Sequence, residues 1–373
     1  MRKILLFVLL LGLVAAGLFW FGVFKVADQS SPGAPQANRS PPPAQAPASS
    51  QAVFPSDDQA LLRAADAPEP RPIMQAQVVL ERLGFSSGVI DGKEGRSFTG
   101  AVRGFQQANR LEPTGRLDAP TRAALVRWER IPSTRTIVIG EDFARGPFPG
   151  PLPREPEQQA RLASLGYADL MEKLAERFHT TPETIRALNP DPGFAPRAGA
   201  RITVPNVGND RVAPNAEAAR GWVGTLISLG VASEQPRAAR IVVDKSDAVL
   251  MVYDAQDRLV AQFPATMGSE RDPLPLGEWR IQGTAFNPDF HYNPRLFWDV
   301  SDSERSVTLP PGPNSPVGVV WIDLSREHYG IHGTPEPRMI GRTESHGCIR
   351  LTNWDAARLA QMVRAGVTAT FRA

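Results

Sequence analysis

The residues with the clearest chemical potential lie near the C-terminal end of this 373-residue chain. Cys348 is the only cysteine, and it stands in the sequence TESHGCIR of residues 343–350. His346 lies just before it, and His332 lies a short stretch upstream. A thiol attacks as its thiolate, and because a free cysteine titrates at about 8.5 it needs a base or a positive field nearby. This pattern predicts a cysteine nucleophile; the alternative is a buried cysteine that packs as a small apolar residue.

The neighbours of Cys348 have types that suit acyl transfer. His332 is the better candidate for the base, because it lies off the cysteine's own strand or loop and could face the thiol across the site. His346 would share a face with Cys348 if the segment is extended, which suits positioning better than deprotonation. The amides of Gly347 and Cys348 could form an oxyanion hole. Arg350 could hold a substrate carboxylate through two hydrogen bonds. We also expect Cys348 to form its thiolate at a pH below the ordinary thiol range.

Two further residues are candidates for substrate contacts. Ser345 could hydrogen-bond within the site, and Tyr292 belongs to a loop that could line a substrate cleft. Tyr292 is equally compatible with an ordinary surface position. No carboxylate or helical histidine pair with zinc spacing accompanies His328, His332 and His346. We therefore expect neither a metal nor another cofactor.

Composition narrows the class of protein. Lys and Arg number 41 and Asp and Glu 39, which gives a net charge of +2, so nothing indicates a nucleic-acid partner. The 36 prolines indicate linkers and surface loops. The length is sufficient for two or three domains with at least one sizeable core.

The N-terminus indicates export. Arg2 and Lys3 precede an uncharged apolar run at 4–24, long enough for a helix of about 31 Å that would cross a bilayer. A cleaved signal peptide is the alternative, but bulky residues continue beyond the small ones at 14–17. We predict a membrane anchor at 1–26 with the rest of the chain outside the cytoplasm. In an oxidising compartment an unpaired thiol needs a reason, and catalysis is the most economical one.

The remaining chain divides by pattern into a linker and a helical segment. Residues 27–71 are rich in Pro, Ala, Ser and Gln, which predicts an extended linker. Residues 72–130 predict a small three-helix domain. Apolar residues recur on one face of a first helix that ends at Gly84, and Asp118 can cap a third helix.

Three more segments follow. Residues 163–207 combine two amphipathic helices with a short strand, and 208–237 are interpreted as an insertion or linker. Residues 238–373 carry many short β-rich runs and one late helix, for which Asn353 is the expected cap. That pattern predicts a mainly-β sandwich-like or barrel-like domain.

The motifs resemble known families. His332-Gly333 followed by SHGCIR at 345–350 resembles the L,D-transpeptidase (YkuD-type) catalytic domain, with TMG and PLG upstream at 266–268 and 275–277. Segment 72–130 resembles the peptidoglycan-binding domain family through its phrases LGF, VIDG, AVRGFQ and GRLD. Segment 163–207 resembles a LysM module through its Asn-Pro and closing strand. The expected fold is therefore multidomain: an N-terminal transmembrane helix, a three-helix domain, a small α+β module and a mainly-β catalytic domain.

The resemblance implies a reaction. Cys348 would form a thioester with a peptidoglycan tetrapeptide stem, release D-alanine and pass the acyl group to an amine, while the carbonyl of Gly333 orients His332. The acceptor would be a diamino acid of a neighbouring stem, giving a 3→3 cross-link, or a protein lysine, for which an outer-membrane lipoprotein is one candidate. The alternatives are an L,D-carboxypeptidase using the same cysteine and a non-catalytic wall tether. The expected location is the inner membrane, with the catalytic part in the periplasm and cell wall.

Overall fold

The computed structural model describes residues 71–208, 212–213, 219–296, 300 and 305–373. The predicted anchor at 1–26 and nearly all of the predicted linker at 27–71 lie outside these residues. Within the described part of the chain, no helix has the length and apolar character needed to span a bilayer.

The first folded region, here called the helical unit, contains α2 (Pro72–Arg82), α3 (Arg96–Ala108) and α4 (Ala119–Leu125). Gly84 follows α2 with a φ of +96°, a conformation that glycine adopts without steric cost. Asp118 caps α4, because its carboxylate accepts the backbone N–H of Thr121 at 3.0 Å. The predicted three helices and the predicted cap are confirmed.

The second region, here called the α+β unit, is built around one antiparallel strand pair. β1 (Thr134–Val138) pairs with β2 (Arg201–Pro205), and α7 (Leu170–Arg177) and α8 (Pro182–Leu188) lie between them in the chain. Short helices α5 (Glu141–Ala144) and α6 (Pro156–Gln159) precede α7. Sequence reasoning found both long helices and β2 but missed β1, so the unit begins well before residue 163. The LysM resemblance stays a prediction.

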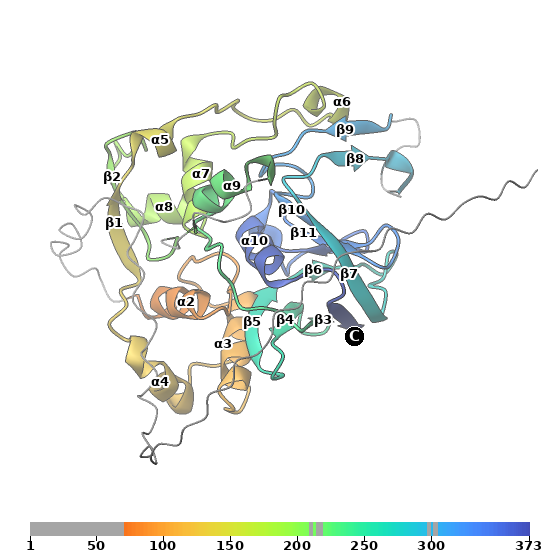
Figure 1. Ribbon diagram of the computed structural model, residues 1–373. Coiled ribbons are helices and arrows are strands. Elements are labelled where there is room, and N and C mark those ends of the chain that lie inside the picture. Colours follow the sequence, from red (N-terminus) through yellow and green to blue (C-terminus); the bar gives the residue numbers. More distant parts are fainter. Residues whose placement is uncertain (1–70, 209–211, 214–218, 297–299, 301–304) are drawn as a thin grey trace, which may run out of the picture. The chain divides into compact units, whose positions relative to one another are not determined.

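The third region, here called the barrel unit, is a nine-stranded sheet in the order β5-β4-β3-β13-β7-β10-β11-β12-β6. Its strands are β3 (Arg240–Asp244), β4 (Val249–Tyr253), β5 (Leu259–Pro264), β6 (Thr266–Met267), β7 (Gly277–Phe286), β10 (Val320–Leu324), β11 (Gly330–His332), β12 (Ile349–Arg350) and β13 (Thr368–Arg372). β5 and β6 form the two edges, yet only Ala265 separates them in the chain. The sheet must therefore curl until its edges almost meet (Figure 1), which confirms the barrel-like prediction and excludes a two-sheet sandwich.

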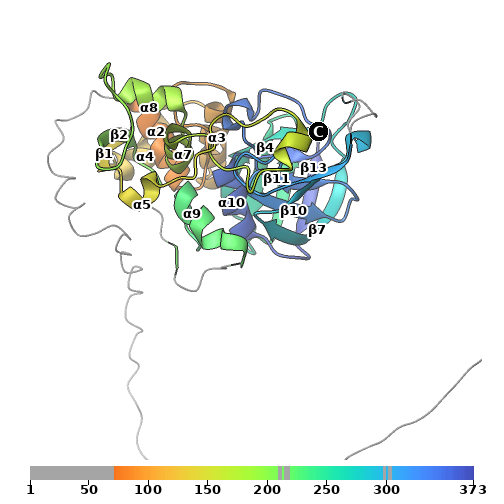
Figure 2. The ribbon, with the colours of Figure 1, turned by 90° about the horizontal axis from the view of Figure 1, so that it is seen from above.

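Two helices fill one face of this sheet. α10 (Asn353–Met362) is almost entirely buried, and α9 (Trp222–Leu229) lies beside it (Figure 2). Trp222 is fully buried and packs against Phe286, with ring centroids 4.6 Å apart and planes tilted by 34°. Of the two interpretations of 208–237, an insertion or a linker, α9 fits the insertion, because its apolar residues pack in the barrel core. The predicted cap of α10 is wrong: Thr352 accepts the N–H of Asp355 at 3.1 Å, which leaves the Asn353 side chain for other contacts.

The helical unit packs directly on the barrel. Phe85 and Phe105 contact an apolar cluster that includes Met251 and Leu259 on the outer face of β4 and β5, where α3 lies in Figure 1. Gln262 joins the two units by three hydrogen bonds, since its backbone bonds to residues 84 and 86 and its side-chain amide donates to the carbonyl of residue 100 at 2.6 Å. The units therefore share a core instead of being joined only by a linker.

A buried charged cluster joins all three units. The Glu81 carboxylate of α2 lies 2.9 Å from both Nδ1 of His179 and Nη1 of Arg358, and each of the three residues is at most 7% exposed. Nε2 of His179 lies 2.9 Å from the carbonyl oxygen of Leu229. Burial would raise the pKa of Glu81, but the Arg358 guanidinium and the His179 ring lower it below its usual value. The ionised carboxylate is thus the common partner of two groups from different units.

Replacing Glu81 by alanine should destabilise the protein by about 3–5 kcal/mol, because Arg358 and His179 would stay buried without their acceptor. The free energy of unfolding from urea titration measures this. Arg103→Ala is the matched control. It breaks the half-exposed ion pair of Arg103 with Asp247, which also joins the helical unit to the barrel unit, and it should cost at most about 1 kcal/mol. Equal losses for the two variants would contradict the importance of the buried cluster.

Candidate active site

Three neighbouring strands assemble the predicted catalytic residues on one face of the barrel sheet. β11 pairs parallel with β12, so that His332 lies opposite Arg350, and antiparallel with β10, so that His332 lies opposite Trp321. Side chains alternate along a strand, and the intervening Ile331 is fully buried in the core on the opposite face. Cys348 directly precedes β12 and therefore lies at the end of the β11–β12 pair.

The His332 ring is held in one orientation and one tautomer. It is 4% exposed and stacks on Trp321 with centroids 5.5 Å apart and planes 16° apart. Nδ1 lies 2.7 Å from the carbonyl oxygen of Gly333, the contact that the family resemblance implies. A carbonyl only accepts, so Nδ1 carries the hydrogen and Nε2 keeps its lone pair. Burial and the Arg350 charge lower the pKa of His332 to about 4, despite the opposing hydrogen bond to Gly333.

The thiol of Cys348 is protonated at neutral pH in this arrangement. Sγ donates to the carbonyl oxygen of His328 at 3.7 Å, and the residue is half-buried. Burial raises the pKa of Cys348, while the backbone of Gly330 and the Arg350 charge lower it only in part. The expected thiolate below the ordinary thiol range is therefore wrong, because desolvation outweighs the nearby positive charge. Among the described residues no hydrogen bond joins Sγ to His332, so deprotonation requires the thiol to turn toward the ring.

The turn that carries the cysteine is fixed by Ser345 and Gly347. The Ser345 hydroxyl donates to the carbonyl of Cys348 at 2.6 Å and accepts the N–H of Gly268 at 2.7 Å. Gly347 has a φ of +100°, and a Cβ there would lie 2.7 Å from the Tyr329 ring. Only glycine fits this position. Ser345 is 4% exposed and bonded to backbone on both sides, which favours a bracing role over the predicted substrate contact.

The remaining predicted residues have different outcomes. His346 is half-buried, but the chain bends at 346–348, so the extended segment on which its shared face with Cys348 depended is wrong. Arg350 lies opposite His332 in the strand register, and its contact with a substrate carboxylate stays a prediction. Tyr292 belongs to β8 (Phe290–Tyr292), which pairs only with β9 (Val307–Leu309) in a separate two-stranded ribbon among the described residues. Its substrate contact stays a prediction.

Three residues that shape the site were missed from the sequence: Trp321, Tyr329 and Asn353. Trp321 and Tyr329 act across strands, one stacking on the base and the other packing on the turn before the thiol. Asn353 was interpreted as a helix cap. No local pattern marks these roles, because each depends on which strand becomes a neighbour.

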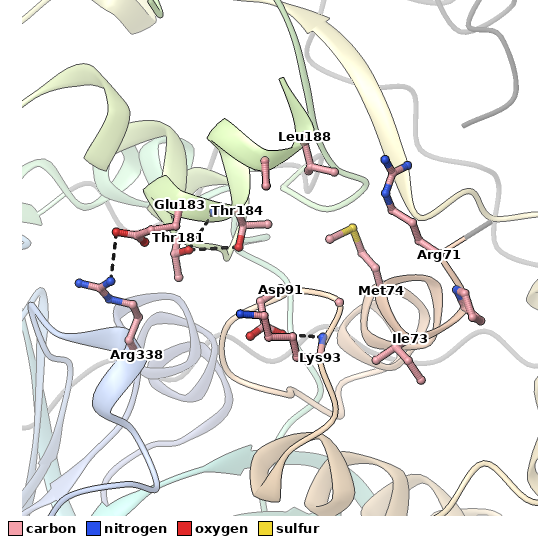
Figure 3. A pocket seen from close by; sticks show the side chains of 13 residues that line it. Arg71, Ile73, Met74, Asp91, Lys93, Thr181, Glu183, Thr184, Leu188 and Arg338 are labelled. Carbon is pink, nitrogen blue, oxygen red and sulfur yellow. Dashed lines mark hydrogen bonds and ion pairs between the residues drawn. The ribbon is translucent and has the colours of Figure 1, made fainter. Parts of the chain in front are cut away.

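A separate hollow lies where the three units meet. Its volume is about 630 Å³, and it is lined by the start of α2, the turn at 91–93, α8 and Arg338 (Figure 3). Arg338 and Glu183 form an ion pair of 3.1 Å at this place. Neither the cysteine nor the histidine base lines this hollow. Arg338 nevertheless belongs to the connection 333–348, which runs from His332 to Cys348.

Two parts of the chain match known protein families. Residues 238–370 match the family described as the L,D-transpeptidase catalytic domain, YkuD, and residues 71–125 match the family described as a putative peptidoglycan binding domain. Both matches agree with the resemblances found in the motifs.

Individual proteins of this kind are also similar to the chain. The putative L,D-transpeptidase YkuD of Bacillus licheniformis is 29% identical over 199 residues, which cover 53% of this chain and 90% of that protein. Its namesake in Bacillus subtilis is 29% identical over 123 residues, 33% of this chain and 60% of that protein. A solved L,D-transpeptidase from Mycobacterium smegmatis is 22% identical, with a TM-score of 0.30, and the match covers 36% of this chain and 58% of that one.

Alkylation of Cys348 by iodoacetamide should accelerate with pH around a midpoint above the ordinary thiol value of about 8.5, because burial raises the pKa of this thiol. Arg350→Ala should move the midpoint further upward, since the guanidinium charge favours the thiolate. Arg364→Ala, which removes an exposed arginine, is the control and should leave the midpoint in place. A wild-type midpoint below 8.5 would contradict this description of the site.

Proposed function

We propose that this chain, whose residues 238–370 belong to the L,D-transpeptidase catalytic domain family, is a cell-wall acyltransferase that uses Cys348 as its nucleophile. The observation that carries the proposal is the state of His332. Its Nδ1–H is committed to Gly333, its pKa of about 4 keeps it neutral at physiological pH, and its Nε2 lone pair is ready to accept a proton. A histidine with a purely structural role has no need of that combination at the end of the strand pair that carries Cys348.

The acylation half of the proposed reaction begins when the thiol turns from His328 toward His332. Nε2 takes the thiol proton as Sγ attacks the carbonyl that precedes the terminal D-alanine of a tetrapeptide stem. The new C–S bond forms, the C–N bond breaks, and D-alanine leaves with the proton held by His332. The backbone amides of Gly347 and Cys348 would donate hydrogen bonds to the oxyanion.

The transfer half runs through the same atoms in reverse. An amine gives its proton to His332 and attacks the thioester, so the amide C–N bond forms and the C–S bond breaks. The thiol then recovers the proton. Arg350 would hold a substrate carboxylate and stabilise the transient thiolate, Ser345 and His346 would keep the turn in place, and Tyr292 would contact the stem.

The other units serve the same polymer in this proposal. Residues 71–125, which match a peptidoglycan-binding family, would hold the enzyme on the wall and raise the local concentration of stems. The α+β unit would add wall contacts as a LysM-like module. An anchor at 1–26 would place the catalytic part in the periplasm, where the acceptor is a neighbouring stem or a lysine of an outer-membrane lipoprotein.

The purified full chain incubated with disaccharide-tetrapeptides should yield cross-linked dimers and free D-alanine, detected by mass spectrometry. Cys348→Ala should abolish both products, because no other residue can form the thioester. Tripeptides without dimers would show a carboxypeptidase instead. A folded wild-type protein that gives neither product would leave only a non-catalytic tether.

The pH dependence of kcat/KM should have an acid limb near pH 4, well below the value of about 6.5 for an ordinary histidine. Since the pKa of His332 is lowered, its proton-accepting form persists as the pH falls and is lost only near pH 4. Arg350→Ala should move the limb to higher pH, because the arginine charge helps to lower that pKa. A limb that stays near 6.5 in the wild type would argue against His332 as the base.

A further inference from the structure

An acidic side chain from outside both matched segments contacts a residue that packs beside His332. Glu176 lies in α7 of the α+β unit and is 5% exposed. Both of its carboxylate oxygens accept from the side-chain amide of Asn353, at 3.0 and 3.3 Å, and Tyr167 donates to Oε2 at 3.2 Å. Asn353 is fully buried, so this is a contact between two units with no access to water.

Asn353 in turn fits against the backbone beside the base. Its Oδ1 accepts the N–H of Val319 at 3.3 Å, and its Nδ2 also donates to the carbonyl of Pro313 at 3.0 Å. A Cβ on either Gly318 or Gly333 would collide with Oδ1. The amide therefore packs directly on two glycine backbones, one of which is the residue that orients the histidine.

The last contact reaches the ring itself. The carbonyl of Gly333 accepts from Nδ1 of His332 at 2.7 Å, while the N–H of Gly333 donates to Val320 at 3.3 Å. The position of that carbonyl fixes which ring nitrogen carries the hydrogen. An unbroken series of direct contacts thus runs from Glu176 through Asn353 and Gly333 to His332.

We infer that Glu176 is a positioning residue for His332, acting through Asn353 and the Gly333 carbonyl. The α+β unit thereby contributes to the competence of the base as well as to any contact with the wall. The catalytic part of this inference rests on the proposed function, whereas the effect on the ring tautomer does not.

The charge state of Glu176 is consistent with this role. Burial raises the pKa of Glu176 to about 8, although the hydrogen bonds from Asn353 and Tyr167 oppose the shift. Burial thus favours the neutral carboxyl form near pH 7, which fixes Asn353 without an uncompensated charge behind His332. Glutamine keeps this neutrality and an oxygen that can accept from Asn353, so Glu176→Gln should preserve the contact.

The experiment compares Glu176→Ala and Glu176→Gln with the wild type. ¹⁵N chemical shifts of the ring nitrogens at pH 7 report the tautomer of His332. The wild type and Glu176→Gln should show the hydrogen on Nδ1, while Glu176→Ala should populate the other tautomer. In the cross-linking assay, Glu176→Ala should lower kcat at least about tenfold with little change in KM, and Glu176→Gln should retain most activity.

Glu81→Ala is the matched control, because it also removes a buried carboxylate that joins units but does not contact Asn353. It should lower stability and leave both the tautomer and kcat unchanged. If Glu176→Ala fails to fold, Glu176→Asp takes its place. The shorter side chain keeps the carboxyl group but withdraws it from Asn353, so this variant should show the same effects in weaker form.

The outcomes are separable. A folded Glu176→Ala protein with the wild-type tautomer and kcat overturns the positioning role, as does an equal loss of kcat in Glu81→Ala. A wild-type protein that forms no product would contradict the proposed function instead, while the ring spectra would still decide whether Glu176 orients His332.

Discussion

The site depends on the short parallel pairing of β11 with β12. Ile331 lies opposite Ile349, both are fully buried, and the N–H of Leu351 donates to the carbonyl of His332 at 2.8 Å. A shift of one residue in this register would move the isoleucines out of the core and His332 into it. The apolar core therefore fixes the relation between His332 and the segment that carries Cys348, since no hydrogen bond among the described residues joins their two side chains.

That pairing sits at the place where the sheet almost closes. β12 is flanked by β6, and Thr266 lies opposite Arg350 in their antiparallel register. The turn after β6 carries Gly268, whose N–H donates to Ser345 beside the cysteine. Because only Ala265 separates β5 from β6, the end of β6 lies next to β12, and the backbone of Gly268 holds the turn that carries Cys348.

Buried polar contacts join the units more specifically than their apolar contacts do. Glu81 joins α2 to Arg358 of α10 and to His179, two residues after α7, and Glu176 joins α7 to the start of α10. Such groups cost desolvation energy, and they tolerate one arrangement of their partners much better than others. The helical and α+β units are therefore parts of the environment of the barrel, whereas composition alone suggested independent modules on a chain.

The sequence by itself determined the local features of this protein. The spacing of apolar residues gave the three helices of the helical unit and the β-rich barrel, and the segment at 345–350 located the turn that carries Cys348. These features depend on neighbours in the chain, so a local pattern is sufficient to find them. Gly347 is an example, because its left-handed φ belongs to the turn itself.

Tertiary structure decided what those local features meet. β1 is a strand because it pairs with β2, more than sixty residues away. α9 is part of the core because Trp222 packs against Phe286. The raised pKa of Cys348 follows from desolvation, which no spacing reveals. Asn353 reads as a helix cap in sequence, yet its amide lies between Glu176 and Gly333. The physical reason is common to all four: burial and hydrogen-bond partners are set by which distant segments pack together.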